Sequence, residues 1–329
     1  DDLDRYHFSN LCEESGVQQA EVEAAVNLLA NTDKIIACWA MGLTQHKNGI
    51  DNIQEVVNLL LLNGHVGRPG AGFCPVRGHS NVQGDRTVGI WEAPSEAFLK
   101  RMEEGLGFPM PQHHGYDVVN AIQAMLDGKV DLFFCMGGNF LSAAPDTDKT
   151  AVALQNIGLT VQVSTKLNRS HLITGREAII LPCLGRTEVD EQTSGQQFVT
   201  VENSMGQVHR SVGGLPPAST ELRSEPWIVA RMAQATLGNQ PLEWMNLVEN
   251  YDGIRSLMAR SLSGFEDYNA RVRQKGGFYL PNGPRDGPTW NTPSGKAVIH
   301  SHTLLERQIP DDRFILMTIR SHDQYNTTI

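Results

Sequence analysis

Hydrophobic and polar positions follow two distinct periods along the first two thirds of the chain. Apolar residues recur three and four positions apart in residues 17–31, 53–61, 95–104, 117–126 and 148–156, which predicts helices. Short segments rich in apolar residues at 34–40, 130–136, 159–163 and 177–181 predict strands. Strands that alternate with helices are typical of a parallel sheet. We therefore expect an α/β fold: a doubly wound, mostly parallel sheet, as in a dinucleotide-binding αβα sandwich, with a helical and irregular extension.

Two segments of this region differ from the simple alternation. The run from Lys34 to Ala40 is apolar after its first residue, and we expect it to be a buried strand. The residues from His65 to Gly89 contain six glycines and show no periodicity. Loops of that length in a compact domain are usually functional, so we expect a functional loop there.

The pattern changes after residue 196. Residues 198–202 and 207–212 flank the turn-like Asn203–Gly206, which predicts a β-hairpin within 196–213. Residues 226–237 and 242–262 have a helical pattern. Residues 276–295 are rich in Gly, Pro and Asn and predict irregular structure, and residues 313–319 are again strand-like.

Composition excludes several classes of function. The 329 residues include 27 Lys and Arg against 37 Asp and Glu, and a formal net charge of −10 argues against nucleic-acid binding. No apolar run approaches the roughly 18 residues of a membrane span. The five cysteines are widely separated and have no metal-ligand spacing, which argues against an iron–sulfur or zinc site within this chain. Reduced thiols favour a cytoplasmic location.

Three polar turns follow predicted strands. They are Met41–Gly49, Gly137–Phe140 and Ser164–His171. Ligands of open parallel sheets bind beyond the carboxyl ends of the strands, so three such turns together favour a nucleotide-like ligand. The glycine fingerprint of nicotinamide enzymes and the P-loop are both absent from the sequence, which leaves a nicotinamide-dependent dehydrogenase as a weak alternative.

Six segments carry a resemblance to a known family. In order and spacing, Trp39–Gly49, Leu61–Gly72 and Pro75–Gly84 resemble the molybdopterin oxidoreductases, specifically the catalytic (alpha) subunits of formate dehydrogenases and their close relatives. Met136–Phe140 resembles the glycine turn of that family, and Thr292–Lys296 a segment before its last domain. Arg320 and His322 resemble the opening of the C-terminal β-barrel.

The resemblance also implies a domain organisation. Residues 1–224 would form the domain that binds molybdopterin guanine dinucleotide, residues 225–310 a helical and irregular extension, and residues 311–329 the start of a truncated barrel. The chain would then be an internal part of a longer enzyme.

The resemblance implies a cofactor and the residues that contact it. The cofactor is a bis-molybdopterin guanine dinucleotide with molybdenum or tungsten, and a 4Fe-4S cluster would be held by the full-length protein but not by this chain. The expected cofactor contacts are Gly42, Thr44, Gln45, His46, Gly78, Gly137, Gly138, Asn139, Phe140, Ser164, Thr165, Lys166, Arg320 and His322. Many members carry an acidic residue at two of these points, where this sequence has Gly138 and Ser164.

By the same resemblance, Arg77 and His79 are the expected catalytic residues. The guanidinium of Arg77 would hold the carboxylate of the substrate, because its two parallel N–H donors match two carboxylate oxygens. Alternatively, Arg77 ties down the Gly-rich loop or a cofactor phosphate. His79 would relay a proton or hydrogen-bond the cofactor. No metal ligand is expected within the chain.

The implied activity is the two-electron oxidation of formate, or a similar small molecule, to carbon dioxide. The electrons would pass to a partner subunit. The chain alone is expected to be inactive, because the metal ligand and the cluster would come from elsewhere in the protein. The alternative is a non-catalytic nucleotide-binding or assembly module of the same fold.

Overall fold

The computed structural model describes residues 6–238, 241–287, 289–303 and 309–316. The chain divides into two compact units. The first comprises the described residues of Asp1–Gly78, Ser204–Gly206 and Pro281–Thr318, and the second those of His79–Asn203 and Gln207–Leu280. The boundary at Gly78 falls within the Arg77-Gly78-His79 motif, so Arg77 and Gly78 belong to the first unit and His79 to the second.

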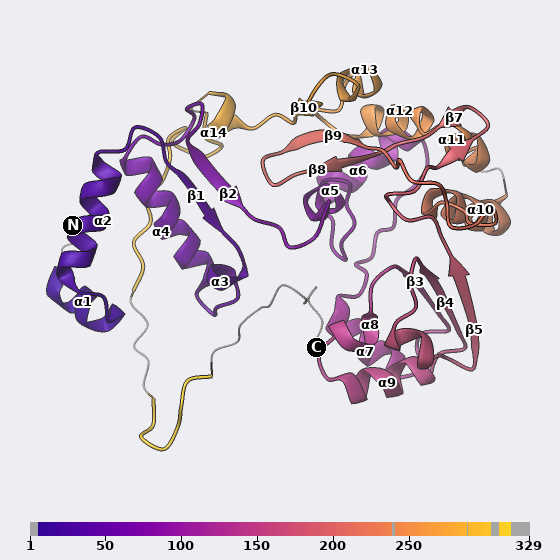
Figure 1. Cartoon of the computed structure of the whole chain (residues 1–329), viewed down its shortest axis with the longest axis horizontal. Helices are drawn as coiled ribbons and strands as arrows, with labels where there is room; N and C mark the ends of the chain where they lie inside the picture. Colours follow the sequence, from indigo (N-terminus) through magenta and orange to yellow (C-terminus); the bar gives the residue numbers. More distant parts are fainter. Residues whose placement is uncertain (1–5, 239–240, 288, 304–308, 317–329) are drawn as a thin grey trace. The chain divides into compact units, whose positions relative to one another are not determined.

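The first unit is built around a β-α-β element. Strands β1 (Ile36–Trp39) and β2 (Gly72–Pro75) pair in parallel, and the long helix α4 (Gly49–Leu62) lies between them in the chain (Figure 1). The remaining helices of this unit are α1 (Phe8–Ser15), α2 (Gln19–Ala30), α3 (Met41–Thr44) and α14 (Gly283–Asp286).

Side chains of α4 hold the returning segment near residue 300. The side-chain amide of Asn58 donates to the carbonyl of His300 at 2.6 Å. One ring nitrogen of His302 lies 2.7 Å from the carboxylate of Glu55, and the other lies 2.7 Å from the side-chain oxygen of Gln54. The two histidines therefore have a structural role in this unit.

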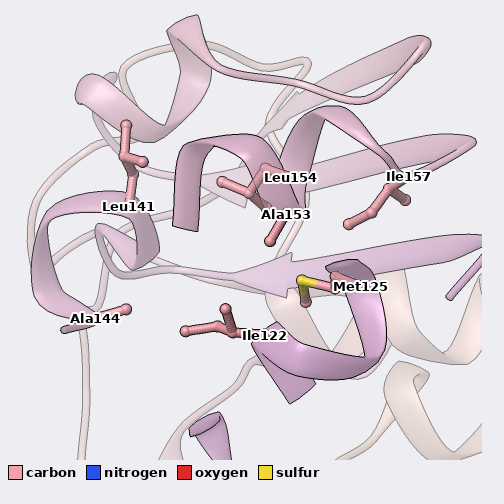
Figure 2. Packing of buried hydrophobic residues seen from close by; sticks show 7 residues of the cluster. All are labelled: Ile122, Met125, Leu141, Ala144, Ala153, Leu154 and Ile157. Atoms are coloured by element: carbon pink, nitrogen blue, oxygen red, sulfur yellow. The ribbon is translucent and has the colours of Figure 1, made fainter. Parts of the chain in front are cut away.

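The sheet of the second unit has helices on both faces. Its order is β3 (Leu132–Met136), β4 (Leu159–Ser164), β5 (Glu177–Pro182), and both pairings are parallel. On one face, helices α7 (Val118–Leu126), α8 (Phe140–Ala143) and α9 (Thr147–Gln155) form an apolar core with β3. Figure 2 shows the buried residues of this core: Ile122, Met125, Leu141, Ala144, Ala153, Leu154 and Ile157.

Helix α10 (Glu225–Leu237) covers the opposite face. Its Ile228 packs with Val163 and Cys183, and Phe134 and Leu181 contact this cluster. Successive residues of a strand point to opposite faces, so β3 contributes to both cores. This arrangement confirms the predicted α/β class with a doubly wound parallel sheet.

The rest of the second unit surrounds an antiparallel sheet of order β10-β9-β8. Two short strands, β6 and β7, pair separately. The bounds are β6 (Glu191–Gln192), β7 (Gly195–Gln196), β8 (Val199–Glu202), β9 (Gln207–Ser211) and β10 (Phe278–Tyr279). The helices are α5 (Val82–Thr87), α6 (Glu96–Leu106), α11 (Trp244–Glu249), α12 (Asp252–Ser261) and α13 (Tyr268–Val272), with a 3-10 helix at Arg169–Leu172.

The helices predicted from the apolar period lie within a few residues of α2, α4, α6, α7 and α9. Four details of the prediction were wrong. The Gly-rich segment contains β2 and α5, the pattern over 242–262 is broken between α11 and α12, and the segment 276–295 contains β10 and α14. The fourth concerns β1: Ile36 is 51% exposed, because a two-stranded sheet covers less of a strand than a wide one.

The strand-like pattern at 313–319 is described only as far as Leu316, and those residues are not in a strand. Across the described segments, no helix is long and apolar enough to cross a membrane.

Candidate functional site

The turn after β3 exposes a row of backbone amides. Gly137 and Gly138 have φ angles of +68° and +77°, a conformation that L-residues with a side chain rarely adopt. The amide of Gly137 continues the sheet by donating to the carbonyl of Val163 at 2.7 Å. Among the described residues, no acceptor receives a hydrogen bond from the amides of Gly138, Asn139 or Phe140. Consecutive amides in such a turn form a concave donor surface suited to an anion.

Polar side chains from the next turn hold this one in place. The side-chain amide of Asn168 donates to the carbonyl of Gly138 at 2.7 Å. The hydroxyl of Ser170 donates to the side-chain oxygen of Asn139 at 2.9 Å and accepts from the amide of Leu141 at 3.0 Å. Ser170 is buried, so these bonds are shielded from water. The turns after β3 and β4 thus form one connected structure.

The predicted residues after β4 lie at the same edge of the sheet. Ser164 is the last residue of β4 and is buried, whereas Thr165 and Lys166 are exposed. Parallel pairing places the ends of β3 and β4 side by side, so the structure brings Gly137–Phe140 and Ser164–Lys166 together. The ammonium of Lys166 is an exposed cation at this edge.

Sequence reasoning included the turn 164–171 but missed the roles of Asn168 and Ser170. Their importance depends on bonds to a turn about 30 residues earlier in the chain. The only signal in the sequence was the concentration of polar residues in that turn.

In the first unit, the predicted residues Gly42, Thr44, Gln45 and His46 lie at the carboxyl end of β1. All of them are exposed, and the short helix α3 carries the first two. A ring nitrogen of His46 lies 2.8 Å from the carbonyl of Gly42, which closes the turn. These residues form a polar surface at the end of the strand, within their own unit.

Arg77 follows β2 directly. The amide of Val76 donates to the carbonyl of Trp39 at 2.7 Å, so the ladder between β1 and β2 reaches the residue before Arg77. Arg77 and Gly78 are exposed in the first unit, and His79 is exposed in the second. The predicted sites Arg320 and His322 lie outside the described residues.

In the second unit, Asn81 anchors the segment after His79. It has a φ angle of +65°, and its side-chain oxygen accepts from the backbone amide of Glu202 in β8 at 2.9 Å. A Cβ atom at Gly84 would collide with that oxygen, so a larger residue there would displace the Asn81 side chain from its bond with Glu202. Asn81 therefore joins the start of α5 to β8.

Glu202 is a buried carboxyl group with one unpartnered oxygen. Its side chain is 7% exposed, and Oε2 has no hydrogen-bond partner among the described residues. Burial raises the pKa of Glu202, and a hydrogen bond with Thr87 offsets part of this effect. Burial therefore makes the ionised form of Glu202 less favourable than that of an exposed glutamate.

A cavity of about 680 Å³ within the second unit adjoins the sheet edge. Met136 at the end of β3 and Gly185 and Arg186 after β5 contribute to its wall. Most of the other wall residues are apolar, and α6 and α10–α12 contribute the largest share of these apolar residues. Glu188 at the rim is engaged structurally, since its two oxygens accept from the amides of Gly185 at 2.6 Å and Ala218 at 2.7 Å.

Comparison with known proteins assigns the family. The family model of the molybdopterin oxidoreductases matches residues 14–231, about two thirds of the chain. The chain therefore belongs to the molybdopterin oxidoreductase family, which implies a molybdopterin cofactor.

Individual relatives are much longer than this chain. It is 49% identical over 316 residues to an uncharacterized oxidoreductase of Mycobacterium tuberculosis, which covers 96% of this chain and 41% of that protein. It is 49% identical over 318 residues to protein YdeP of Escherichia coli K12, with 96% and 42% covered. A Staphylococcus aureus protein provisionally named a formate dehydrogenase is 30% identical over 152 residues, with 42% and 15% covered. The chain thus spans about two fifths of the first two relatives.

The residues at the sheet edge fit a phosphate-bearing cofactor of this kind. The amides of Gly138, Asn139 and Phe140 are donors without protein acceptors in the described part of the chain. A Cβ atom at either glycine of the turn would meet nothing within 4 Å, so the space over the turn is open to a ligand. Among the described residues, no group of three or more His, Cys, Asp or Glu side chains could hold a metal ion. The donor set is therefore suited to the anionic part of a cofactor and not to its metal.

Proposed function

We propose that this chain holds part of a bis-molybdopterin guanine dinucleotide, with molybdenum or tungsten, in an oxidoreductase that converts formate to carbon dioxide. The observation that carries the proposal is the amide row of Gly138–Phe140, fixed by Asn168 and Ser170 at the carboxyl end of β3. Family membership and the provisional name of the Staphylococcus aureus relative support it.

In this proposal, the chain binds and orients the cofactor. The three amides donate to a phosphate, while Ser164, Thr165 and Lys166 contact the nucleotide end. Gly42, Thr44, Gln45, His46 and Gly78 contact the cofactor from the first unit. The bound cofactor supplies the two-electron redox chemistry.

Arg77 binds the substrate in this proposal. Its guanidinium donates two parallel hydrogen bonds to the two oxygens of formate, and its charge is permanent. His79 accepts or passes on a proton near the same place. The electrons leave through a 4Fe-4S cluster held by another part of the full-length protein, toward a partner subunit.

Substituting Arg77 tests the substrate assignment in the full-length enzyme. Arg77→Lys keeps the charge but loses the fork, so we expect a higher KM and a lower kcat for formate, together about 1.5–3 kcal/mol in kcat/KM. Dye reduction under anaerobic conditions measures both constants. Arg101→Lys, at an exposed position of α6, is the matched control. Unchanged kinetics of Arg77→Lys would remove Arg77 from the substrate site.

A further inference from the structure

Cys38 and Cys74 occupy directly paired positions on two neighbouring strands. The parallel ladder between β1 and β2 aligns Cys38 with Cys74, one residue before the end of each strand. Side chains of paired residues leave a sheet on the same face. The rings of Trp39 and Phe73, at adjacent positions, contact each other with centroids 6.4 Å apart, as expected for the opposite face. Both cysteines belong to the first unit.

The spacing of neighbouring strands suits a covalent link between these residues. Strands in a sheet lie about 4.8 Å apart. Disulfide-linked cysteines have Cα atoms roughly 4.4 to 6.8 Å apart, so paired positions already lie within that range. The two thiols also interact: burial raises the pKa of Cys74, and a hydrogen bond and charge interaction with Cys38 raise it further.

The other cysteines lack these properties. All five are described, and Cys38 is the exposed one. Cys183 is 3% exposed, and burial raises its pKa to about 11. Burial also raises the pKa of Cys135. Since exposure and thiolate formation control attack on an external disulfide, Cys38 is the cysteine best placed to react first.

We propose that Cys38 and Cys74 form a reversible intramolecular disulfide, with a low-molecular-weight disulfide such as oxidised glutathione as the oxidant. The thiolate of Cys38 attacks the external disulfide, which gives a mixed disulfide and releases one external thiol. The thiolate of Cys74 then attacks the sulfur of Cys38 and releases the second external thiol. Two protein thiols are oxidised, the external disulfide is reduced to two thiols, and the protons of the cysteines pass to the departing thiolates.

The proposed disulfide would lie close to the carboxyl ends of β1 and β2. It would link β1 and β2 immediately before Met41–Gly49 and Arg77–Gly78. The hydrogen-bonded ladder, and not the sulfur atoms, sets the strand separation. Departures from ideal disulfide geometry make the bond more easily reduced, so we expect a labile bond that a dithiol reductant reopens.

Mass spectrometry of the full chain tests the proposal. The protein is treated with oxidised glutathione, remaining thiols are alkylated, and the unreduced protein is digested with trypsin. The expected product joins peptides 35–47 and 48–77, at the mass of the two peptides less two hydrogens; Pro69 protects the bond after Arg68 from cleavage. Dithiothreitol should separate the pair.

Two variants make the test specific. Cys38→Ser should lose the joined peptides, and Cys12→Ser should retain them. The unmodified chain alone decides the matter even if a variant fails to fold. Glutathione on Cys38 with Cys74 still open to alkylation would overturn the proposal. So would a Cys38–Cys38 link between two chains.

Discussion

Gly138 combines an unusual backbone conformation with an open space above it. Its φ of +77° would cost an alanine about 1–2 kcal/mol. If the turn binds a cofactor phosphate, Gly138→Ala should displace the donor amides. We expect the affinity of the full-length protein for guanine nucleotide to fall by about tenfold, since 1.4 kcal/mol corresponds to that factor. Nucleotide retained after dilution measures it.

Gly128 provides the matched control for this substitution. It has a φ of +70° at the end of α7 and the same open space for a Cβ atom. Gly128→Ala should therefore impose a similar strain without changing nucleotide retention. Equal retention by the two variants would argue against a role of the Gly138 turn in binding.

The buried carboxyl group of Glu202 should make the free energy of unfolding depend on pH. Its folded-state pKa is raised above the ordinary value of 4.5, so its contribution to stability is fully present below that value and is lost as pH rises through the folded-state pKa. Glu202→Gln should therefore raise the free energy of unfolding at neutral pH by about 1 kcal/mol, because a buried, poorly partnered carboxylate is replaced by an amide. The gain should shrink as pH falls toward 4.5.

Urea unfolding at several pH values measures this effect. Glu104→Gln, at an exposed position of α6, should change the curves little at any pH. A Glu202→Gln variant that is less stable than the parent at neutral pH would show that the ionised carboxylate contributes favourably to the fold.

At the element scale, Asp252 anchors the start of α12. Its carboxylate accepts from Arg273 at 2.8 Å and from Arg255, whose side chain is 5% exposed and also donates to the carbonyl of Phe198 at 3.1 Å. Burial alone would raise the pKa of Asp252, but the hydrogen bonds from the two arginines outweigh it and lower the pKa below 3.8. Asp252 therefore pairs with the buried guanidinium of Arg255, and Arg255 connects α12 to the residue before β8.

Removing that carboxylate should destabilise the second unit. Asp252→Asn leaves Arg255 without its counter-charge, and we expect a loss of about 1–3 kcal/mol, reduced from the cost of a fully buried pair because Asp252 is partly exposed. The contribution of Asp252 is present above its unfolded-state pKa and is lost as pH falls through the lower folded-state pKa. Chemical unfolding at neutral and acidic pH checks both points.

The control for this substitution is Asp131→Asn at an exposed position before β3. It should leave the unfolding free energy almost unchanged. If Asp252→Asn behaves like the control at neutral pH, the ion pair contributes nothing measurable to stability.

The elements that could be predicted from sequence were those with a sustained pattern. Helix α7 shows apolar residues on one face over its whole length, and β4 alternates apolar residues with polar ones, which is the period of a strand. Strand β2 has four residues, begins at a glycine and ends at a proline, so its pattern is too short to indicate a strand. It becomes a strand because β1 offers it a hydrogen-bonding edge.

The candidate site could likewise be predicted only where a local sequence pattern marks it. The glycine turn after β3 was visible because Gly137-Gly138 follows an apolar run. The support from Asn168 and Ser170 was not, since it depends on hydrogen bonds between turns that are distant in sequence. The pairing of Cys38 with Cys74 likewise requires the register of two strands, which no local pattern specifies.

At the scale of the whole molecule, the chain contains two units, each with a parallel sheet and a polar segment at the carboxyl ends of its strands. Relatives that match almost the entire chain are more than twice as long, so the proposed catalytic activity belongs to the full-length protein. The proposal therefore predicts that the 329-residue chain alone does not reduce a dye with formate. Formate-dependent dye reduction by the chain alone would contradict it.

The most direct test of the proposed function is the metal and nucleotide content of the full-length protein after anaerobic purification. Elemental analysis and acid release of guanine nucleotide give both values per polypeptide. The proposal predicts one molybdenum or tungsten and two guanine nucleotides for each chain, as the bis-guanine-dinucleotide cofactor requires. A protein that contains neither metal nor guanine nucleotide would contradict the proposal and favour a non-catalytic assembly module of the same fold.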